Sequence, residues 1–422
     1  MISIKKIRDK PEFIAKKLSS KNDSTDINNL LKIDNEVRNL KTRSSELRAS
    51  RNSASESIAR IKKNSEDPTH AIRQTKIIGE ELKVVENNLD KVEKQFNYVM
   101  ERIPNTPHDS VPVGANASGN ILVREWGEKK KYNFPLKDHL ELGESLKLFD
   151  FKRGAKLSGS GFPLYMGKGA ELERKLINAM LDYHIKNFGF KEILPSVLIN
   201  KESMQTTGQL PKFQDDMYHT EVDNLYLAPT AEVPITSLHR NEILSESDLP
   251  LKYVGYSPCF RRESGSYGKD TRGLLRVHQF NKVELVEFTA PENSFNELES
   301  LTLQAETVLQ RLGLHYRVIE LCSGDLSFSA SKCYDIELWA PAEEKWLEVS
   351  SCSNFESFQA RRGNIKYRLD ENKKTNFVHT INGSGLATPR LVVALIETYQ
   401  NSEGIVRFPQ TVASFLGIKE LS

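Results

Sequence analysis

The sequence is poor in cysteine and lacks long apolar runs, and each shortage excludes a class of protein. Its 422 residues include four cysteines, Cys259, Cys322, Cys333 and Cys352, none of which belongs to a CxxC pair. This spacing argues against a zinc knuckle and against a disulfide framework, so we expect reduced thiols in a cytoplasmic protein. Because no apolar run approaches the ~20 residues of a membrane span, no membrane association is expected.

The net charge is also small, because 59 lysines and arginines stand against 57 aspartates and glutamates. No overall positive field therefore favours nucleic acid, and any RNA binding must come from local patches. The basic segment 1–18 has no apolar h-region and is interrupted by Asp9, Pro11 and Glu12, which excludes a secretory signal. A short amphipathic helix of the mature fold is favoured there over a mitochondrial presequence.

The chain does have enough length and apolar content, 38% hydrophobic residues, for two or three domains. The cluster of prolines and glycine at 104–114 predicts a linker between an N-terminal region, 1–103, and a globular region, 115–422. The globular region alternates strands and helices without βαβ regularity, which indicates an α+β fold. A helix is predicted at 170–189, followed by a strand at 190–198 whose Pro195 indicates a sheet edge or an interface.

Residues 27–103 carry a coiled-coil seam. Mostly apolar residues recur at alternating spacings of three and four from Leu30 to Ile61, interrupted at Ser44 and Arg51, and again from Ile78 to Ile103. Because Pro68 cannot continue a helix, the pattern predicts an antiparallel helical hairpin with its tip there. A dimerising coiled coil would explain the periodicity equally well. Basic residues on the first limb favour RNA instead, and the candidate contacts are Arg38, Lys41, Arg48 and Arg51.

Residues 259–288 carry the clearest sign of chemistry, because they predict two strands joined by a long polar loop. Arg261 and Glu263 share a face of the first strand. One face of the second strand holds, by alternation, Arg276, His278, Phe280, Lys282 and Glu284. Arginine forks suit phosphates and a flat ring suits a base, so the hairpin predicts a bound nucleotide. For the arginines alone, a solvated hairpin with ordinary surface charge is the alternative.

These residues resemble a known family. FRRE at 260–263 and VHQFNKVE at 277–284 are similar to motif 2 of the class II aminoacyl-tRNA synthetases, and specifically to the bacterial type of seryl-tRNA synthetase. Four further segments stand in the order that the family has: TGQLPKF at 207–213, APTAEVP at 228–234, EVSSCSNF at 348–355 and NGSGLATPR at 382–390. The resemblance covers essentially the whole chain. It implies a class II catalytic domain, with a mixed, mostly antiparallel sheet flanked by helices, preceded by the coiled-coil arm.

The resemblance also implies an activity and partners. The reaction would be ATP-dependent ligation of L-serine to tRNA(Ser) through a seryl-adenylate, and tRNA(Sec) would also be charged. The arm would grip the long variable arm of the tRNA, and the helix and strand at 170–198 would build a homodimer interface. ATP and Mg²⁺ would be needed. Zinc would not, because His219, His239 and His379 lack metal-ligand spacing.

Three alternatives belong to other classes: a catalytically inactive synthetase-like interaction protein, an amino acid:carrier-protein ligase on the same fold, and a plain coiled-coil scaffold. The first would normally have lost the motif arginines or the acids for serine, which are present here. The second would lack the long arm, and the third would not explain residues 200–390. Exchange of pyrophosphate into ATP, tested with each amino acid, would separate all four hypotheses.

Site residues follow from the resemblance, position by position. Catalytic roles are implied for Arg261, Glu348 and Arg390. ATP would be bound by Arg261, Arg262, Glu263, Val277, Phe280, Glu348, Val349, Ser350, Ser351 and Arg390. Serine would be bound by Thr230, Ala231, Glu232, Arg261, Glu284, Asn382 and Ser384. Glu348 and Ser351 would hold Mg²⁺ against the ATP phosphates, as its preference for oxygen ligands allows. Lys269 and Arg272 of the motif 2 loop would contact tRNA.

Arg390 is unusual on physical grounds too, because it lies in the first turn of an apolar helix. The helix dipole disfavours a cation at that end, so an anion must compensate it. By resemblance this anion is the γ-phosphate of ATP, and a salt bridge to an acidic side chain is the alternative.

Overall fold

The computed structural model describes residues 1–264, 272–369 and 374–422. The described chain forms two compact units, one of residues 2–19 and 23–103 and one of residues 1, 20–22 and 104–422. Residues 104–114 therefore pack as part of the larger unit; for example, the Asn105 side chain donates to the carbonyls of Ser329 and Phe355 at 3.0 and 2.8 Å. Within the described residues, no helix is both long and apolar enough to cross a bilayer.

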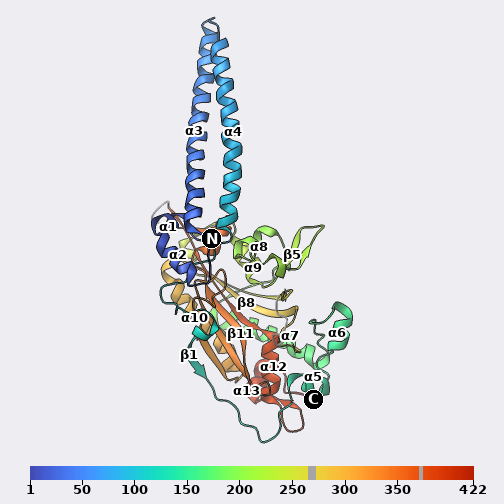
Figure 1. Cartoon of the computed structure of the whole chain (residues 1–422). Coiled ribbons are helices and arrows are strands. Elements are labelled where there is room, and N and C mark those ends of the chain that lie inside the picture. The colour runs from blue at the N-terminus through green and yellow to red at the C-terminus, as the bar shows by residue number, and fades with distance from the viewer. Residues whose placement is uncertain (265–271, 370–373) are drawn as a thin grey trace. The chain divides into compact units, whose positions relative to one another are not determined.

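The smaller unit is a long helical hairpin with two short helices before it. These are α1 (Ile4–Asp9), α2 (Pro11–Ser19), α3 (Ile27–Lys63) and α4 (Thr69–Met100). Helices α3 and α4 run side by side in opposite directions and are joined at the tip that contains Pro68 (Figure 1). The antiparallel hairpin predicted from the seam is therefore confirmed. Asp26 caps α3 by accepting from the Asn29 N–H at 2.9 Å.

The seam of this hairpin is well buried only near its base. Leu30, Ile33, Val37 and Leu47 are 7% exposed or less. Towards the tip, Arg51 is exposed and the seam positions that follow it are half-buried. Less apolar contact therefore stabilises the distal part of the hairpin than its base. Many polar side chains of the distal part are exposed to solvent.

The larger unit is built on an eight-stranded sheet of order β1-β9-β10-β11-β14-β8-β7-β2. In that order the strands are Ile121–Trp126, Tyr316–Glu320, Lys332–Ala340, Lys345–Asn354, His379–Ala387, Gln279–Thr289, Leu251–Phe260 and Lys191–Ile193. Every neighbouring pair is antiparallel except β2 and β7, so the predicted mixed, mostly antiparallel sheet is confirmed. The strand predicted at 190–198 is broken: β2 ends at Ile193, before Pro195, and Leu198–Ile199 forms β3 of a separate sheet. Strand β2 does lie at the edge of its sheet, as Pro195 indicated.

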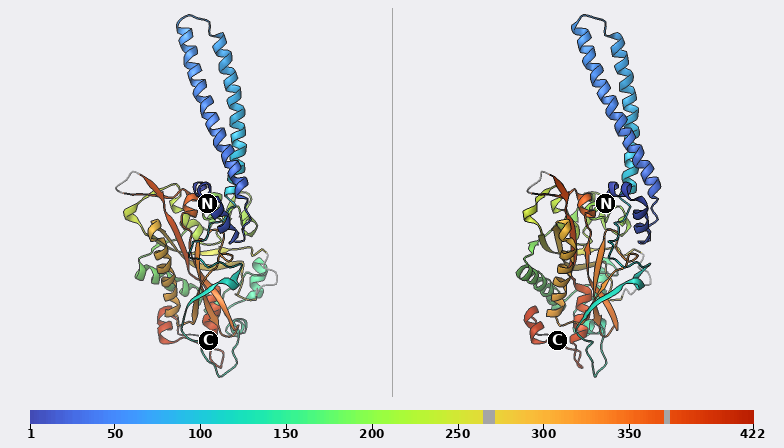
Figure 2. Two further views of the ribbon diagram at one scale, coloured as in Figure 1. Left: turned by 60° about the vertical axis from the view of Figure 1, so that its left-hand side comes forward. Right: turned by 90° about the vertical axis from the view of Figure 1, so that its left-hand side faces the viewer.

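Helices α7 (Gly167–Phe188) and α10 (Ser294–Arg311) cover one face of this sheet (Figure 2). Alternation along the strands explains how one face is apolar and the other polar. In β8, Val283 and Leu285 belong to the core with these helices, whereas Lys282 and Glu284 line a pocket on the opposite face. The same holds in β14, where a Cβ on Gly383 would lie 2.3 Å from Leu301 of α10.

The remaining elements surround this frame. The helices are α5 (His139–Ser145), α6 (Phe151–Ser158), α8 (Lys201–Thr207), α9 (Glu232–Thr236), α11 (Phe358–Gly363), α12 (Thr388–Tyr399) and α13 (Gln410–Leu416). The strands are β3 (Leu198–Ile199), β4 (His219–Thr220), β5 (Leu225–Leu227), β6 (Ile243–Ser245), β12 (Lys366–Arg368), β13 (Thr375–Phe377), β15 (Val406–Arg407) and β16 (Glu420–Leu421). Helix α12 is buried over nearly all its length, as predicted from its apolar sequence.

Candidate active site

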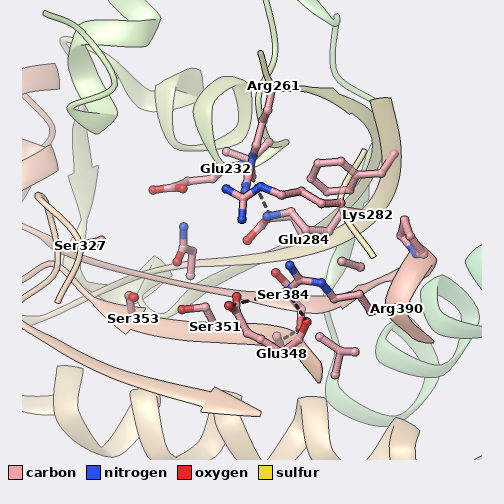
Figure 3. Close-up of a pocket in the computed structure, with 18 of the residues that line it drawn as sticks. Glu232, Arg261, Lys282, Glu284, Ser327, Glu348, Ser351, Ser353, Ser384 and Arg390 are labelled. Carbon is pink, nitrogen blue, oxygen red and sulfur yellow. Dashed lines mark hydrogen bonds and ion pairs between the residues drawn. The ribbon is translucent and has the colours of Figure 1, made fainter. Parts of the chain in front are cut away.

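The polar face of the sheet holds a cavity of about 350 Å³. Strands β8, β11 and β14 form its floor, and the start of α12 and residues 274–277 form part of its wall. Figure 3 shows Glu232, Arg261, Lys282 and Glu284 gathered on one side, with Glu348, Ser351 and Arg390 across from them. Two groups of charged side chains therefore face one space.

Most residues predicted for ATP and serine line this cavity. They are Thr230, Glu232, Arg261, Glu263, Val277, Phe280, Glu284, Glu348, Val349, Ser350, Ser351, Asn382, Ser384 and Arg390. Of the described residues, the lining includes neither Ala231 nor Arg262. Ala231 is fully buried in the hydrophobic cluster behind α9, and the Arg262 N–H donates to the Asp216 carbonyl at 3.0 Å.

The motif 2 hairpin differs in detail from its prediction. Strand β7 ends at Phe260 and β8 begins at Gln279, so Arg261, Glu263, Arg276 and His278 lie outside the strands. Alternation therefore cannot place these four, although three of them still line the pocket. His278 does not, because its ring packs against Phe162 and its Nδ1 lies 3.1 Å from the Arg261 carbonyl. Close packing of the chain near Gly161 takes His278 away from the face predicted for it.

Glu284 is the centre of the carboxylate side of the pocket. Its Oε2 accepts from the Thr230 hydroxyl at 2.7 Å and lies 2.5 Å from the Lys282 ammonium. All three side chains are buried, with 9% exposure or less. Strand alternation brings Lys282 and Glu284 to one face, and the bend that precedes α9 brings Thr230 to Glu284.

Glu232 is a second buried carboxylate on the same side. Its Oε1 accepts from the Gln359 amide at 2.7 Å, and its carboxylate also hydrogen-bonds the Asn382 side chain. Burial first, and then the nearby Glu284 carboxylate, raise the pKa of Glu232 to about 7. A positively charged ligand group placed here would relieve this repulsion and favour the ionised form.

Arg261 and Phe280 form the wall beside these acids. The Arg261 guanidinium lies 5.2 Å from the centre of the Phe280 ring, within the range of a cation–π contact. Its Nε donates to the Pro229 carbonyl at 3.3 Å, which orients the fork. Next to them Arg276 and Glu263 form a salt bridge at 2.5 Å.

Arg390 and Glu348 form the opposite side. The Arg390 Nε donates to the Leu275 carbonyl at 3.0 Å, and its Nη1 lies 3.8 Å from Glu348 Oε2. The salt bridge considered from sequence is therefore present, but it is long and half of the Glu348 side chain is exposed. This leaves donors of the Arg390 fork available for a second anion.

The donors around Glu348 fit a magnesium ion. A carboxylate and the Ser351 hydroxyl line the same wall of the cavity, and hard oxygen donors of this kind suit Mg²⁺. Beneath them Asp335 pairs across the strands with Ser351. Burial, with Glu348 beside it, raises the pKa of Asp335 well above its ordinary value. Ser350 has a structural hydrogen bond instead, because its hydroxyl donates to the Ser384 carbonyl at 2.7 Å.

Sequence reasoning missed several polar residues in or beside this pocket. Lys282 was placed on the correct face by alternation, but no role was predicted for it. Ser327 lines the pocket although it lies far in sequence from every motif. Gln359 of α11 follows the motif at 348–355 by four residues and does not line the pocket, but its amide donates to Glu232. The buried Lys282 was the one that could have been found, since a lysine on a face with Glu284 needs a partner.

The candidate tRNA residues divide according to their partners. Arg38 pairs with Asp34 at 3.3 Å, Lys41 with Glu93 at 2.7 Å and Arg48 with Glu86 at 2.6 Å, so these three form ion pairs within the hairpin. Arg51 is exposed and forms no ion pair with the described residues. Arg272 pairs with Asp138 at 2.6 Å. Lys269 lies outside the described residues.

Comparison with known proteins agrees with this geometry. Residues 1–107 match the model of the seryl-tRNA synthetase N-terminal domain, and residues 213–399 match that of the tRNA synthetase class II core domain for G, H, P, S and T. A serine–tRNA ligase from Chlorobium phaeobacteroides is 52% identical over 93% of this chain and 91% of its own length. One from Chloroherpeton thalassium is 48% identical over 99% of both chains.

The chain belongs to the seryl-tRNA synthetase family.

Solved structures place the fold in the same family. The seryl-tRNA synthetase of Pyrococcus horikoshii complexed with ATP superposes with a TM-score of 0.92 at 36% identity, covering 100% of this chain and 99% of that one. The cytoplasmic serine–tRNA ligase of Naegleria fowleri in complex with AMP gives 0.84 at 28% identity, covering 98% and 95%. Both relatives hold an adenine nucleotide, which agrees with membership of the class II aminoacyl-tRNA synthetases.

Proposed function

We propose that this seryl-tRNA synthetase ligates L-serine to tRNA(Ser) with ATP, through a seryl-adenylate. The observation that carries the proposal is that one pocket has two charged walls: Glu232, Arg261, Lys282 and Glu284 on one side, and Arg390 with Glu348 across from them. The first suits an amino acid and the second a polyphosphate. Full-length relatives named serine–tRNA ligase support the same substrate pair.

Adenylate formation joins a serine carboxylate oxygen to the α-phosphorus of ATP and releases pyrophosphate. The reaction needs positioning and charge neutralisation more than a general base. Arg261 stands beside Phe280, so a base stacked on that ring would place the α-phosphate near the guanidinium. Glu263 would accept from the adenine amine, with the backbone of Val277 and Val349 against the base, and Arg390 would meet the γ-phosphate.

Mg²⁺ supplies charge neutralisation for the phosphates when it is bound, and Glu348 and Ser351 are the residues that would hold it. The chain's own residues prepare this wall. Arg390 Nη1 donates to the Glu348 carbonyl at 3.0 Å, which fixes the strand that carries both candidate ligands. We propose no structural zinc.

Serine recognition rests on the buried carboxylates. Glu284 and Glu232, with Thr230, would hold the ammonium, and Ser384 with Asn382 would pair with the hydroxyl. Each of these groups is buried, so an amino acid without a hydroxyl would leave polar atoms unsatisfied. Alanine should be rejected strongly for this reason.

The arm provides the tRNA contact in this proposal, and its distal half is the better candidate surface. Residues 49–78 hold six lysines and arginines against three acids, whereas residues 27–48 and 79–103 together hold nine of each. Arg51, Arg60, Lys62 and Lys63 form no ion pairs within the described residues, unlike Arg38, Lys41 and Arg48. We therefore move the proposed contact from the base of the hairpin towards its tip.

Further parts of the proposal concern organisation. Residues 1–103 would form the tRNA-binding domain, 104–114 the connection and 115–422 the catalytic domain. A homodimer is supported by apolar side chains near the edge strand, since Leu194 is 82% and Leu198 45% exposed. Cytoplasmic tRNA(Ser), and tRNA(Sec) where a cell has it, would be the substrates.

The decisive experiment is pyrophosphate exchange into ATP with each of the twenty amino acids, followed by charging of tRNA(Ser). We expect exchange with serine well above that with alanine, threonine and cysteine, and charging of tRNA(Ser) but not of a tRNA with a short variable arm. Exchange without charging would point to a carrier-protein ligase. Neither activity, in a folded preparation, would favour the inactive synthetase-like protein.

A further inference from the structure

Lys282 is a buried cation for which the reaction described above has no role. Its side chain is 9% exposed, it lines the cavity, and its Nζ lies 2.5 Å from Glu284 Oε2. Within the described residues, Lys282 forms its ion pair with Glu284. A buried ammonium that loses its carboxylate is strongly unfavourable, so this contact cannot simply open.

The same carboxylate is the one proposed to bind the ammonium of serine. Its Oε2 already accepts from Thr230 at 2.7 Å as well as from Lys282. A second ammonium at this oxygen would crowd like charges together, so Lys282 must give way when serine enters. It needs another anion within reach of its flexible four-carbon stem.

Serine brings that anion itself. The charged groups on this side of the pocket are the Glu232 and Glu284 carboxylates and the Arg261 and Lys282 cations, which balance each other when Glu232 is ionised. Serine enters as a zwitterion, with one ammonium and one carboxylate. An exchange in which Glu284 takes the substrate ammonium and Lys282 takes the substrate carboxylate leaves every buried charge paired.

We propose that Lys282 occupies the place of the substrate ammonium in the empty pocket and transfers its contact from Glu284 to the serine carboxylate on binding. This inference rests on the proposed function, because it assumes that serine's amino group meets Glu284. The pocket then selects amino acids against simple amines. An amine without a carboxylate would displace Lys282 and leave it buried without an anion.

Two ligands separate this exchange from a structural role. Serine has both charged groups, and ethanolamine is serine without its carboxylate. In the wild type we expect ethanolamine to inhibit serine-dependent pyrophosphate exchange only weakly. In Lys282→Met, the KM for serine should rise on the order of tenfold or more, because a charged hydrogen bond is lost. The inhibition constant of ethanolamine should fall, because Glu284 no longer has a competing ammonium.

The test is that the KM for serine rises while the inhibition constant of ethanolamine falls. A distorted pocket would instead weaken the binding of both ligands. Lys282→Arg keeps the charge and should keep weak ethanolamine inhibition. Thermal shift provides a second readout that needs no catalysis: ethanolamine should raise the Tm of Lys282→Met more than that of the wild type. The KM for ATP should change little in either variant.

Parallel weakening of serine and ethanolamine, or no change in either, would overturn the proposal. If Lys282→Met does not fold, a crystal structure of the wild type with serine decides the matter, with Lys282 Nζ expected at the substrate carboxylate rather than at Glu284. Wild-type exchange is measured in the same series. A wild type without serine-dependent pyrophosphate exchange would count against the proposed function. Normal pyrophosphate exchange, with serine and ethanolamine affected in the same direction by Lys282→Met, would count only against the proposed change of partner by Lys282.

Discussion

Arg390 lies against Glu348, with its Nη1 3.0 Å from the Glu348 carbonyl and 3.8 Å from the Glu348 carboxylate. The first contact holds the backbone of β11, and the second is long enough to be exchanged for a stronger anion. A guanidinium held by carbonyls on two different segments, Leu275 and Glu348, is positioned before any ligand arrives. Preorganised donors of this kind lose little free energy to reorientation during the reaction.

Replacement of Arg390 should therefore slow adenylate formation more than it weakens the fold. We expect Arg390→Ala to lower the rate of pyrophosphate exchange by ~10²–10³, the usual effect of losing one preorganised donor. Arg390→Lys keeps the charge but loses the planar guanidinium, so its exchange rate should lie between those of the wild type and Arg390→Ala. Exchange assays at saturating ATP and serine check this, and a wild-type rate in Arg390→Ala would remove Arg390 from the phosphate site.

Arg261 has a matched control in its neighbour. Arg261→Ala should lower exchange on the order of 10²–10³, because Arg261 lines the cavity beside Phe280. Arg262→Ala should stay near the wild-type rate of exchange, since Arg262 is not among the described residues that line the cavity. Similar losses in both variants would mean that the loop as a whole, rather than the Arg261 guanidinium, had been disturbed.

The pKa of Glu232 predicts how serine binding depends on pH. With this pKa raised to about 7, the carboxylate is mostly ionised at pH 8 and mostly protonated at pH 6. Because the serine ammonium binds the ionised form, the KM for serine should rise about tenfold between pH 8 and pH 6. Measurement of KM by exchange at three pH values tests this. Glu232→Gln should raise KM at every pH and flatten the profile.

Charge on the arm can be tested by two sets of substitutions of equal size. Alanine at the distal Arg60, Lys62 and Lys63 should weaken tRNA binding and reduce its salt dependence by roughly 0.7–0.9 in slope per lost phosphate contact. Alanine at the proximal Arg38, Arg43 and Arg48 should affect affinity much less, because these residues pair with acids of the hairpin. Filter binding across a salt series measures both, with serine activation as the internal control. Equal losses of tRNA affinity in the two sets would mean that the base of the arm contacts tRNA as much as its distal part does.

Much of this fold could be predicted because its signals are periodic. The seam from Leu30 predicted α3 and α4, and Pro195 predicted the edge at β2. In motif 2, alternation gave the correct face for Phe280, Lys282 and Glu284, which lie within β8. It was wrong for His278, because the strand starts later than its sequence suggests and packing near Gly161 decides where that ring lies.

The parts that sequence could not give depend on contacts between distant residues. Gln359 reaches Glu232 from a helix 127 positions later, and no local pattern predicts that amide. The pairing of Arg48 with Glu86 follows from the register of the two arm helices. Composition alone therefore predicted that the first limb binds RNA through basic residues such as Arg38, Lys41 and Arg48. In the structure, these residues form ion pairs within the hairpin.

The division of β8 between core and pocket also limits how the gene can vary. Because successive residues of a strand point to opposite faces, adding one codon between Phe280 and Lys282 would reverse the faces of the residues that follow it. Val283 and Leu285 would turn to the substrate, while Lys282 and Glu284 would turn into the apolar layer under α7 and α10. Catalysis and folding would then fail together. Natural length variation in this family should accordingly avoid this strand and collect in the loops and the arm.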